Sequence, residues 1–297
     1  MLRRILKWTS IAVGGVIALV LLAFAFAFFY VERVLNKEHD VPAHSVVVPT
    51  DTAAIAEGQR LATIRGCYGG CHGPEAEGEV MFDEPLIARA VAPSLAYLSR
   101  EYTPAQFERA VRHGVVGDGN TVLIMPSITF THMSDEDLGT IIAFLRSLPE
   151  DDGPLTEMNP RALGYFMLTM GLFQDFTLAP EEIDHAAPHR ATTPTDTLAL
   201  GEYLAISICS LCHGSDLRGG EGMENQAPNL SIAAAFSLEG FTHVLRDGIG
   251  LGGRELNEMK EAAESFKHFE DDEIAALHAY LRTLPPEDTE ESNAQRP

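Results

Sequence analysis

The sequence is organised around Cys209-Ser210-Leu211-Cys212-His213, a C-x-x-C-H pentapeptide. This spacing is typical of covalent haem attachment, in which two thiols form thioethers with the porphyrin and the histidine ligates its iron. Residues three and four apart share one face of a helical turn, so the three side chains can project toward one ligand. The pentapeptide therefore predicts a c-type haem site in the C-terminal half of the chain.

A looser copy of the motif stands at Cys67-Tyr68-Gly69-Gly70-Cys71-His72. Its cysteines still share a helical face, but the histidine follows the first cysteine by five residues instead of four. Gly69-Gly70 supplies backbone freedom that can absorb the extra residue. The alternatives are a zinc site, which would need two more Cys or His ligands, and a disulfide, which leaves the histidine unexplained. All four cysteines lie in the two motifs, and we predict one covalent haem c at each.

The sequence around these motifs repeats. Four pairs of segments recur in the same order: Ala92-Pro93-Ser94-Leu95 with Ala227-Pro228-Asn229-Leu230, 107–114 with 241–248, 130–137 with 266–273, and 143–149 with 279–285. A glycine also precedes each motif inside a helical pattern, where it costs about 1 kcal/mol relative to alanine. We expect Gly58 and Gly201 to mark close helix crossings, with Phe144 and Tyr280 packed against them. The pattern predicts two copies of one fold.

Local signals make this fold helical. Thr103-Pro104-Ala105-Gln106 combines an N-cap, a proline at the first helical position and a capping-box glutamine. Ser134 and the three acids after it begin the last helix of the first copy, and Pro149 ends it. Asp271 and Pro285 bound the corresponding helix of the second copy. The sequence therefore predicts an all-α fold.

The N-terminus carries a long apolar segment. Residues 11–31 form an uncharged run of 21 residues that follows Arg3, Arg4 and Lys7. A helix of that length spans about 30 Å, enough for the hydrocarbon core of a bilayer. A cleaved signal peptide is the alternative, since Ala25-Phe26-Ala27 resembles a cleavage site, but the run is longer than its usual apolar region. We expect a retained single-pass anchor in the bacterial inner membrane, with the remaining chain in the periplasm.

The charge of the chain is strongly acidic. It has 21 basic and 43 acidic residues in 297, a net charge of −22 that becomes −25 once the three basic residues before the anchor are set aside. Such a surface argues against nucleic acid and favours a redox protein partner with a basic docking face. Solubility alone is the other explanation.

These features divide the chain into six parts. We expect an anchor over 1–33, a tether over 34–52, a first domain over 53–151, an inter-domain helix and linker over 152–191, a second domain over 192–286, and an acidic tail over 287–297. The short helix within 160–173 is expected to cover the seam between the domains.

Over roughly 53–150 and 192–286 the chain resembles the cytochrome c family, in particular membrane-anchored dihaem cytochromes with two tandem class I-like domains. C-H-G at 71–73 and 212–214, the two A-P-x-L segments and the final helices ending in Leu-Pro carry the resemblance. It implies that His72 and His213 ligate iron and that the carbonyls of Pro93 and Pro228 orient them. It also implies a methionine ligand from a downstream loop in each domain.

Two methionines stand at suitable positions for this role. Met125 precedes a proline, as the family pattern requires, and Met259 lies in the matching region of the second copy. Their rivals are Met81 and Met133 in the first copy and Met223 and His268 in the second; His132 and His268 together would give bis-histidine ligation. Methionine is favoured because His/Met ligation raises the potential, as an electron carrier requires.

No Ser/His/Asp set, phosphate loop or nucleotide fingerprint appears with supporting context, so electron transfer is the expected function and the chain is not expected to be an enzyme itself. It would relay single electrons between a respiratory or dehydrogenase donor and a downstream acceptor. The partner would be a dehydrogenase, a quinol-oxidising complex or a terminal oxidase. A cytochrome subunit fixed to a periplasmic dehydrogenase is the first alternative, and a dihaem peroxidase is the second.

Overall fold

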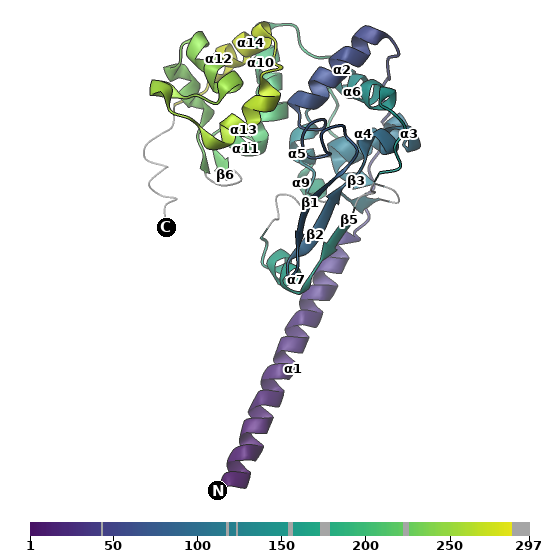
Figure 1. The fold of residues 1–297 in the computed structure, drawn as a ribbon, viewed down its shortest axis with the longest axis vertical. Coiled ribbons are helices and arrows are strands. Elements are labelled where there is room, and N and C mark those ends of the chain that lie inside the picture. The colour runs from purple at the N-terminus through teal and green to yellow at the C-terminus, as the bar shows by residue number, and fades with distance from the viewer. Residues whose placement is uncertain are drawn as a thin grey trace.

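The computed structural model describes residues 1–42, 44–116, 119–122, 124–153, 157–172, 179–221 and 226–286, so the acidic tail lies outside the described residues. Helix α1 (Leu2–Leu35) extends alone from the body of the molecule (Figure 1). It is the one helix among the described residues that is long and apolar enough to cross a membrane. Its large apolar side chains, from Ile5 to Phe29, are mostly exposed, as a lipid-facing surface would be.

The C-terminal turns of α1 pack against helix α7 (Ala162–Thr169). The ring of Tyr165 contacts Phe24 and Phe28 at centroid distances of 6.0 and 5.2 Å, and its hydroxyl donates to Glu32. Helix α7 was expected to cover the seam between the domains, and this expectation is wrong. It packs on the anchor helix instead (Figure 1).

A three-stranded antiparallel sheet lies between α7 and the first domain. Its order is β1 (Glu79–Glu84), β2 (Ala88–Ala92) and β5 (Glu157–Pro160). The fold is mostly helical, which confirms the predicted class, but the sheet was not predicted. Strand β5 falls in the segment predicted to be a linker. It forms by backbone pairing with β2, and a strand this short has no clear pattern of side chains that would predict it.

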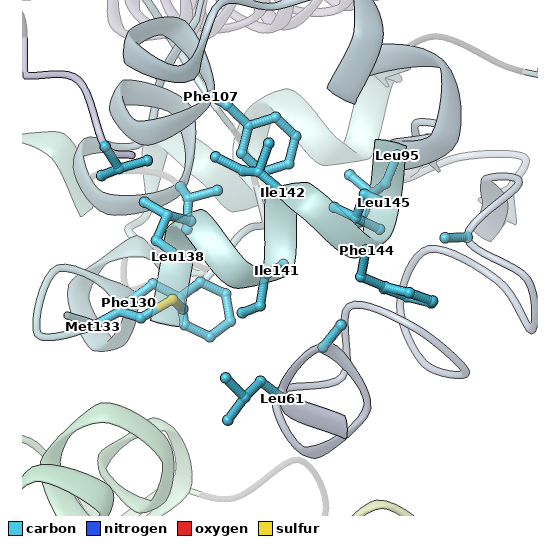
Figure 2. Packing of buried hydrophobic residues seen from close by; sticks show 14 residues of the cluster. Leu61, Leu95, Phe107, Phe130, Met133, Leu138, Ile141, Ile142, Phe144 and Leu145 are labelled. Carbon is cyan, nitrogen blue, oxygen red and sulfur yellow. The ribbon is translucent and has the colours of Figure 1, made fainter. Parts of the chain in front are cut away.

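The first domain is built from helices with the short hairpin β3–β4 between them. The elements are α2 (Thr52–Ile64), α3 (Leu95–Glu101), α4 (Pro104–His113), β3 (Val115–Val116), β4 (Asn120–Thr121), α5 (Ser127–Phe130) and α6 (Asp135–Ser147). Figure 2 shows α6 at the centre of the core, with Leu138, Ile142 and Leu145 against Phe107 and Leu95. The predicted capping box of α4 and the Ser134 cap of α6 are both present.

The second domain repeats this plan. Its elements are α10 (Thr197–Leu204), the π-helical turn η1 (Ala205–Cys209), α11 (Ser210–His213), β6 (Gly220–Glu221), β7 (Gln226–Ala227), η2 (Leu230–Ala235), α12 (Leu238–Asp247), η3 (Leu251–Gly253), α13 (Asn257–Phe266) and α14 (Asp271–Leu281). Helix α10 packs on α14 as α2 packs on α6.

The glycines before the two motifs permit these crossings. A Cβ on Gly58 would lie 2.1 Å from the carbonyl oxygen of Thr140 and 2.8 Å from Cβ of Phe144. A Cβ on Gly201 would lie 2.1 Å from the carbonyl oxygen of Ala276 and 2.7 Å from Cβ of Tyr280. Both expected pairings are therefore confirmed, and neither crossing leaves room for a side chain.

The segment expected as a tether is packed on the first domain. Val46 is buried in the domain's core and Val41 is also buried. The backbone N–H of His39 donates to Gly119 at 2.9 Å, and Gly139 of α6 lies directly under the carbonyl of Val47. The valines of this segment thus hold the domain close to the anchor instead of suspending it.

Candidate haem sites

The second motif lies on a continuous run of helix. Helix α10 passes into the π-helical turn, which ends at Cys209, and α11 carries Cys212 and His213. A π turn adds one residue to a helix and rotates the residues after it. The Nδ1 atom of His213 lies 2.8 Å from the carbonyl oxygen of Pro228.

The first motif reaches the same arrangement by another route. Helix α2 ends at Ile64, and residues 67–72 form turns, so the expectation that Cys67 and Cys71 share a helical face is wrong. Gly69 has a φ of +74°, in the left-handed region that glycine adopts at no steric cost. This turn absorbs the extra residue, and Nδ1 of His72 lies 2.9 Å from the carbonyl oxygen of Pro93.

These contacts define the state of both imidazoles. A carbonyl oxygen only accepts hydrogen bonds, so Nδ1 of each histidine must carry the proton and the lone pair is on Nε2. Burial lowers the pKa of both His72 and His213 and thereby favours the neutral ring. A neutral imidazole with Nδ1 donating to a carbonyl is the form in which histidine binds a metal.

The cysteines are thiols without disulfide bonds. Burial raises the pKa of Cys67 to about 12 and that of Cys209 to about 12. Burial also raises the pKa of Cys71 and of Cys212. Two unpaired thiols beside an oriented histidine match the donor set that covalent haem attachment needs.

Each methionine favoured from the sequence packs on the same core as the cysteine of its domain. Met125 and Cys67 border the first core cluster, and Met259 and Cys209 border the second. Each domain thus brings the first cysteine of its motif and the favoured methionine to one apolar cluster, which fits a haem group.

The rival ligands are placed differently. Met133 is 1% exposed within the first core, and Met81 is exposed on β1. His132 and His268 are both exposed, just ahead of α6 and α14, so they flank the closing helices. Met223 lies outside the described residues.

The second haem motif lies against helix α5 of the first domain, which the sequence did not reveal. The hydroxyl of Ser210, inside the second motif, lies 3.2 Å from the hydroxyl of Thr129 on α5. Helix α5 begins two residues after Met125 and also contacts η1 and α11. Each partner is a small polar residue at an ordinary position, so only the tertiary structure brings them together.

A buried polar network fixes the seam beside this contact. The hydroxyl of Tyr203 donates to Asp137 at 2.7 Å, and the guanidinium of Arg65 donates to the same carboxylate oxygen at 2.7 Å. The backbone N–H of Ser134 donates to the Tyr203 hydroxyl. At the edge of the seam, Arg60 pairs with Glu273 at 2.7 Å. The network ties α2 and α6 of the first domain to α10 of the second.

Comparison with known families agrees with this architecture. Residues 198–285 match the family model described as "Cytochrome c", and residues 53–145 match "Cytochrome C oxidase, cbb3-type, subunit III". Fold, motifs and family models thus define two small helical domains of the c-type haem class. The chain is a membrane-anchored cytochrome c with two domains, an electron-transfer protein with covalently bound haem c, and two domains fit two haems.

Curated relatives resemble the chain along most of its length. It is 26% identical over 279 residues to "Alcohol dehydrogenase (quinone), cytochrome c subunit" of Komagataeibacter europaeus, covering 80% of this chain and 57% of the relative. It is 25% identical over 273 residues to "Fructose dehydrogenase cytochrome subunit" of Gluconobacter japonicus, covering 80% and 54%. It is 24% identical over 283 residues to "Gluconate 2-dehydrogenase cytochrome c subunit" of Pantoea cypripedii, covering 81% and 62%. The chain thus spans little more than half the length of these relatives.

Proposed function

We propose that the chain is the membrane-tethered dihaem subunit of a periplasmic dehydrogenase and passes single electrons from that enzyme to a downstream acceptor. The observation that carries the proposal is the contact of Ser210 with Thr129, since it sets the second haem motif against the helix that follows Met125. The names of the relatives, all cytochrome subunits of dehydrogenases, support the choice of partner. A free relay between respiratory complexes is the other form of the same function.

The proposed site residues divide the work. Cys67, Cys71, Cys209 and Cys212 would hold the two haems covalently, His72 and His213 would be axial ligands, Met125 and Met259 would fill the opposite axial positions, and Pro93 and Pro228 orient the histidines. When bound, the haem supplies one-electron chemistry between ferric and ferrous iron. An iron held by both the histidine and the methionine of its domain would keep no coordination site for a substrate, as an electron carrier requires.

The buried seam between the domains supports a fixed separation of the two proposed haem sites. Arg65 is fully buried in its side chain and its charge is met by Asp137, which Tyr203 also contacts. Removing one member of such a network leaves an uncompensated buried charge, so the arrangement resists opening. A constant separation between the two haem sites is what an internal relay needs.

The proposed location is the inner membrane, with both domains in the periplasm. Ala27 and Val31 are 1% and 2% exposed, and Phe24 packs on Tyr165 of α7. Cleavage after Ala27 would remove the contact of Phe24 with Tyr165, which supports a retained anchor. The acidic surface supports a basic docking face on the partner, because complementary fields speed encounter.

Purification of the tagged chain from detergent-solubilised membranes tests the proposal. We expect a large catalytic subunit in stoichiometric amount that survives washing at high salt, and reduction of both haems when the substrate of that subunit is added. The variant Leu21→Ala, which alters only an exposed side chain of α1, should retain the partner. Isolation of the chain alone, with both haems rapidly reduced by a quinol, would contradict the fixed-subunit form and favour the free relay.

A further inference from the structure

The structure gathers histidines and a carboxylate at a place remote from either haem motif in the sequence. Glu108 and His113 lie on α4 of the first domain, and His189 lies on the segment that leads to the second domain. One ligand atom from each of the three lies within 4.8 Å of the other two. We propose that Glu108, His113 and His189 bind a divalent transition metal ion of the zinc type.

The two distances from Glu108 fit a coordinated ion better than hydrogen bonds. The Oε1 atom of Glu108 lies 3.4 Å from Nε2 of His113 and 3.5 Å from Nε2 of His189. Hydrogen bonds between nitrogen and oxygen are shorter, near 2.9 Å as a rule. Ligands of tetrahedral zinc, each about 2.0–2.2 Å from the ion, are separated by about 3.4 Å. Two histidines and a glutamate form one of the ligand sets that zinc adopts.

The charge balance also calls for a cation. Glu108 is 0% exposed, and its Oε2 atom is buried without a hydrogen-bond partner among the described residues. The guanidinium of Arg112 lies 3.3 Å from Glu108 but 2.7 Å from Asp135, so one cation faces two carboxylates. His44 also contacts Asp135, at 3.0 Å. A buried carboxylate is costly unless it is paired or coordinates a metal, and an ion on the Oε1 side of Glu108 would compensate its charge.

A second layer of contacts orients one of the ligands. Nδ1 of His113 lies 2.9 Å from Nδ1 of His185, so the two rings share one proton between these atoms. With Nδ1 of His113 as the donor, its Nε2 presents a lone pair toward Glu108. Metal-binding histidines are commonly held in this way through their other ring nitrogen.

Comparison with the second domain shows which of these residues belong to the fold that the two domains share. Arg112 and Asp135 recur there as Arg246 and Asp271, which also form an ion pair, at 2.6 Å. Thr242 and Asp247 replace Glu108 and His113 at the corresponding positions. The arginine–aspartate pair is therefore common to both domains, whereas in the described part of the chain the cluster occurs in the first domain alone.

An ion here would clamp the inter-domain segment to the first domain. The segment already bonds the start of α6, since the N–H of Asp135 donates to Arg190 at 2.8 Å and Thr193 donates to Asp137 at 2.6 Å. A metal bound by His189 and by the two ligands on α4 would extend this contact by one residue, from Arg190 to His189. It would thereby fix the direction in which the chain leaves for the second domain.

Metal analysis of the haem-loaded full chain, purified without a polyhistidine tag, tests the inference. After treatment with a chelator and addition of zinc alone, we expect one tightly held zinc per chain besides haem iron, and nitrogen and oxygen neighbours at the zinc absorption edge. His189→Ala should weaken zinc binding at least about 100-fold, since even outer-shell partners cost 10–100-fold. The same variant should leave both haem spectra unchanged.

His243→Ala is the matched control, because His243 forms an exposed pair with Asp247 on the equivalent helix. It should bind zinc as the wild type does. Glu108→Gln keeps the shape of the buried side chain and should also lose zinc, so that a folding defect in one variant does not decide the result. Zinc binding that is absent in the wild type, or equal in His189→Ala and His243→Ala, would overturn the inference and identify the cluster as a metal-free charge network.

Discussion

The two haem motifs differ in backbone but agree in the placement of the histidine. In the second domain the motif continues a helix through a π turn, and in the first it is a series of turns opened by left-handed glycines. The Nδ1-to-carbonyl distances are nevertheless 2.8 and 2.9 Å. The position of each imidazole is therefore set by the proline segment and the helix crossing. The residues between the cysteines can differ in conformation as long as they connect the helix to the histidine.

The helix crossings should be the most sensitive points in both domains. Gly58→Ala and Gly201→Ala each place a Cβ against a backbone carbonyl that cannot move aside, so each should cost more than about 4 kcal/mol in its own domain. Thermal unfolding with domain-specific proteolysis would measure the loss. Gln59→Ala and Glu202→Ala, at the exposed neighbouring positions, should unfold like the wild type. Equal stability of the glycine and control variants would show that the crossings are not the common element.

The methionines should separate the two domains spectroscopically. Met125→Ala and Met259→Ala should each remove part of the weak methionine–iron band near the red end of the spectrum and lower one haem potential, because thioether ligation favours ferrous iron. Redox titration of each variant measures both effects. Met133→Leu and His268→Ala, which alter the rival ligands, should leave band and potentials in place. A band lost in either of these two instead would reassign the axial ligand.

The glycine route of the first motif can be tested on its own. Gly69→Ala forces a left-handed alanine, which costs roughly 1–2 kcal/mol. The loss should appear in the first domain alone, measured as a lower midpoint of its chemical unfolding. Gly240→Ala in α12 of the second domain, where a Cβ meets only ordinary contacts, should be neutral or slightly stabilising. A neutral Gly69→Ala would mean that the turn does not absorb the extra residue.

The smallest expected difference between the two domains is in how much Asp135 and Asp271 contribute to stability. Burial alone would raise the pKa of Asp135, but hydrogen bonds from Arg112 and His44 outweigh it and lower the pKa below its usual value. A lowered pKa gives stability that is present above the unfolded value near 3.9 and is lost as the pH falls through the folded value. Asp135→Asn in chelated protein should therefore cost about 1 kcal/mol at pH 7, a figure kept small because solvent screens the pair, and nothing at strongly acidic pH. Asp271→Asn, at a 90% exposed side chain, should show a smaller cost, and equal pH profiles would contradict this account.

The sequence predicted the features that depend on local pattern. The helix caps at Thr103 and Ser134, the crossings at Gly58 and Gly201 and the apolar N-terminal helix follow from residue type and spacing, and all are present. The sheet could not be predicted, because β5 joins β2 through backbone bonds across a separation of many residues.

The candidate sites show the same limit. The cysteines and histidines of the haem motifs can be recognised from their spacing in the sequence. The contact of Ser210 with Thr129 and the cluster around Glu108 join residues from distant segments, so no local pattern predicts them. The placement of α7 was mistaken for a similar reason. Its apolar residues predict that the helix is buried but not which surface it packs on. In the structure it packs on the anchor helix and not on the seam between the domains.

Mass spectrometry of the intact purified chain tests the central claim, that each domain carries its own covalent haem. We expect a mass increase of two haems, with peptide mapping placing one on the segment that holds Cys67 and Cys71 and the other on the segment that holds Cys209 and Cys212. A single haem on the second segment, with Cys67 and Cys71 free or joined in a disulfide, would contradict it.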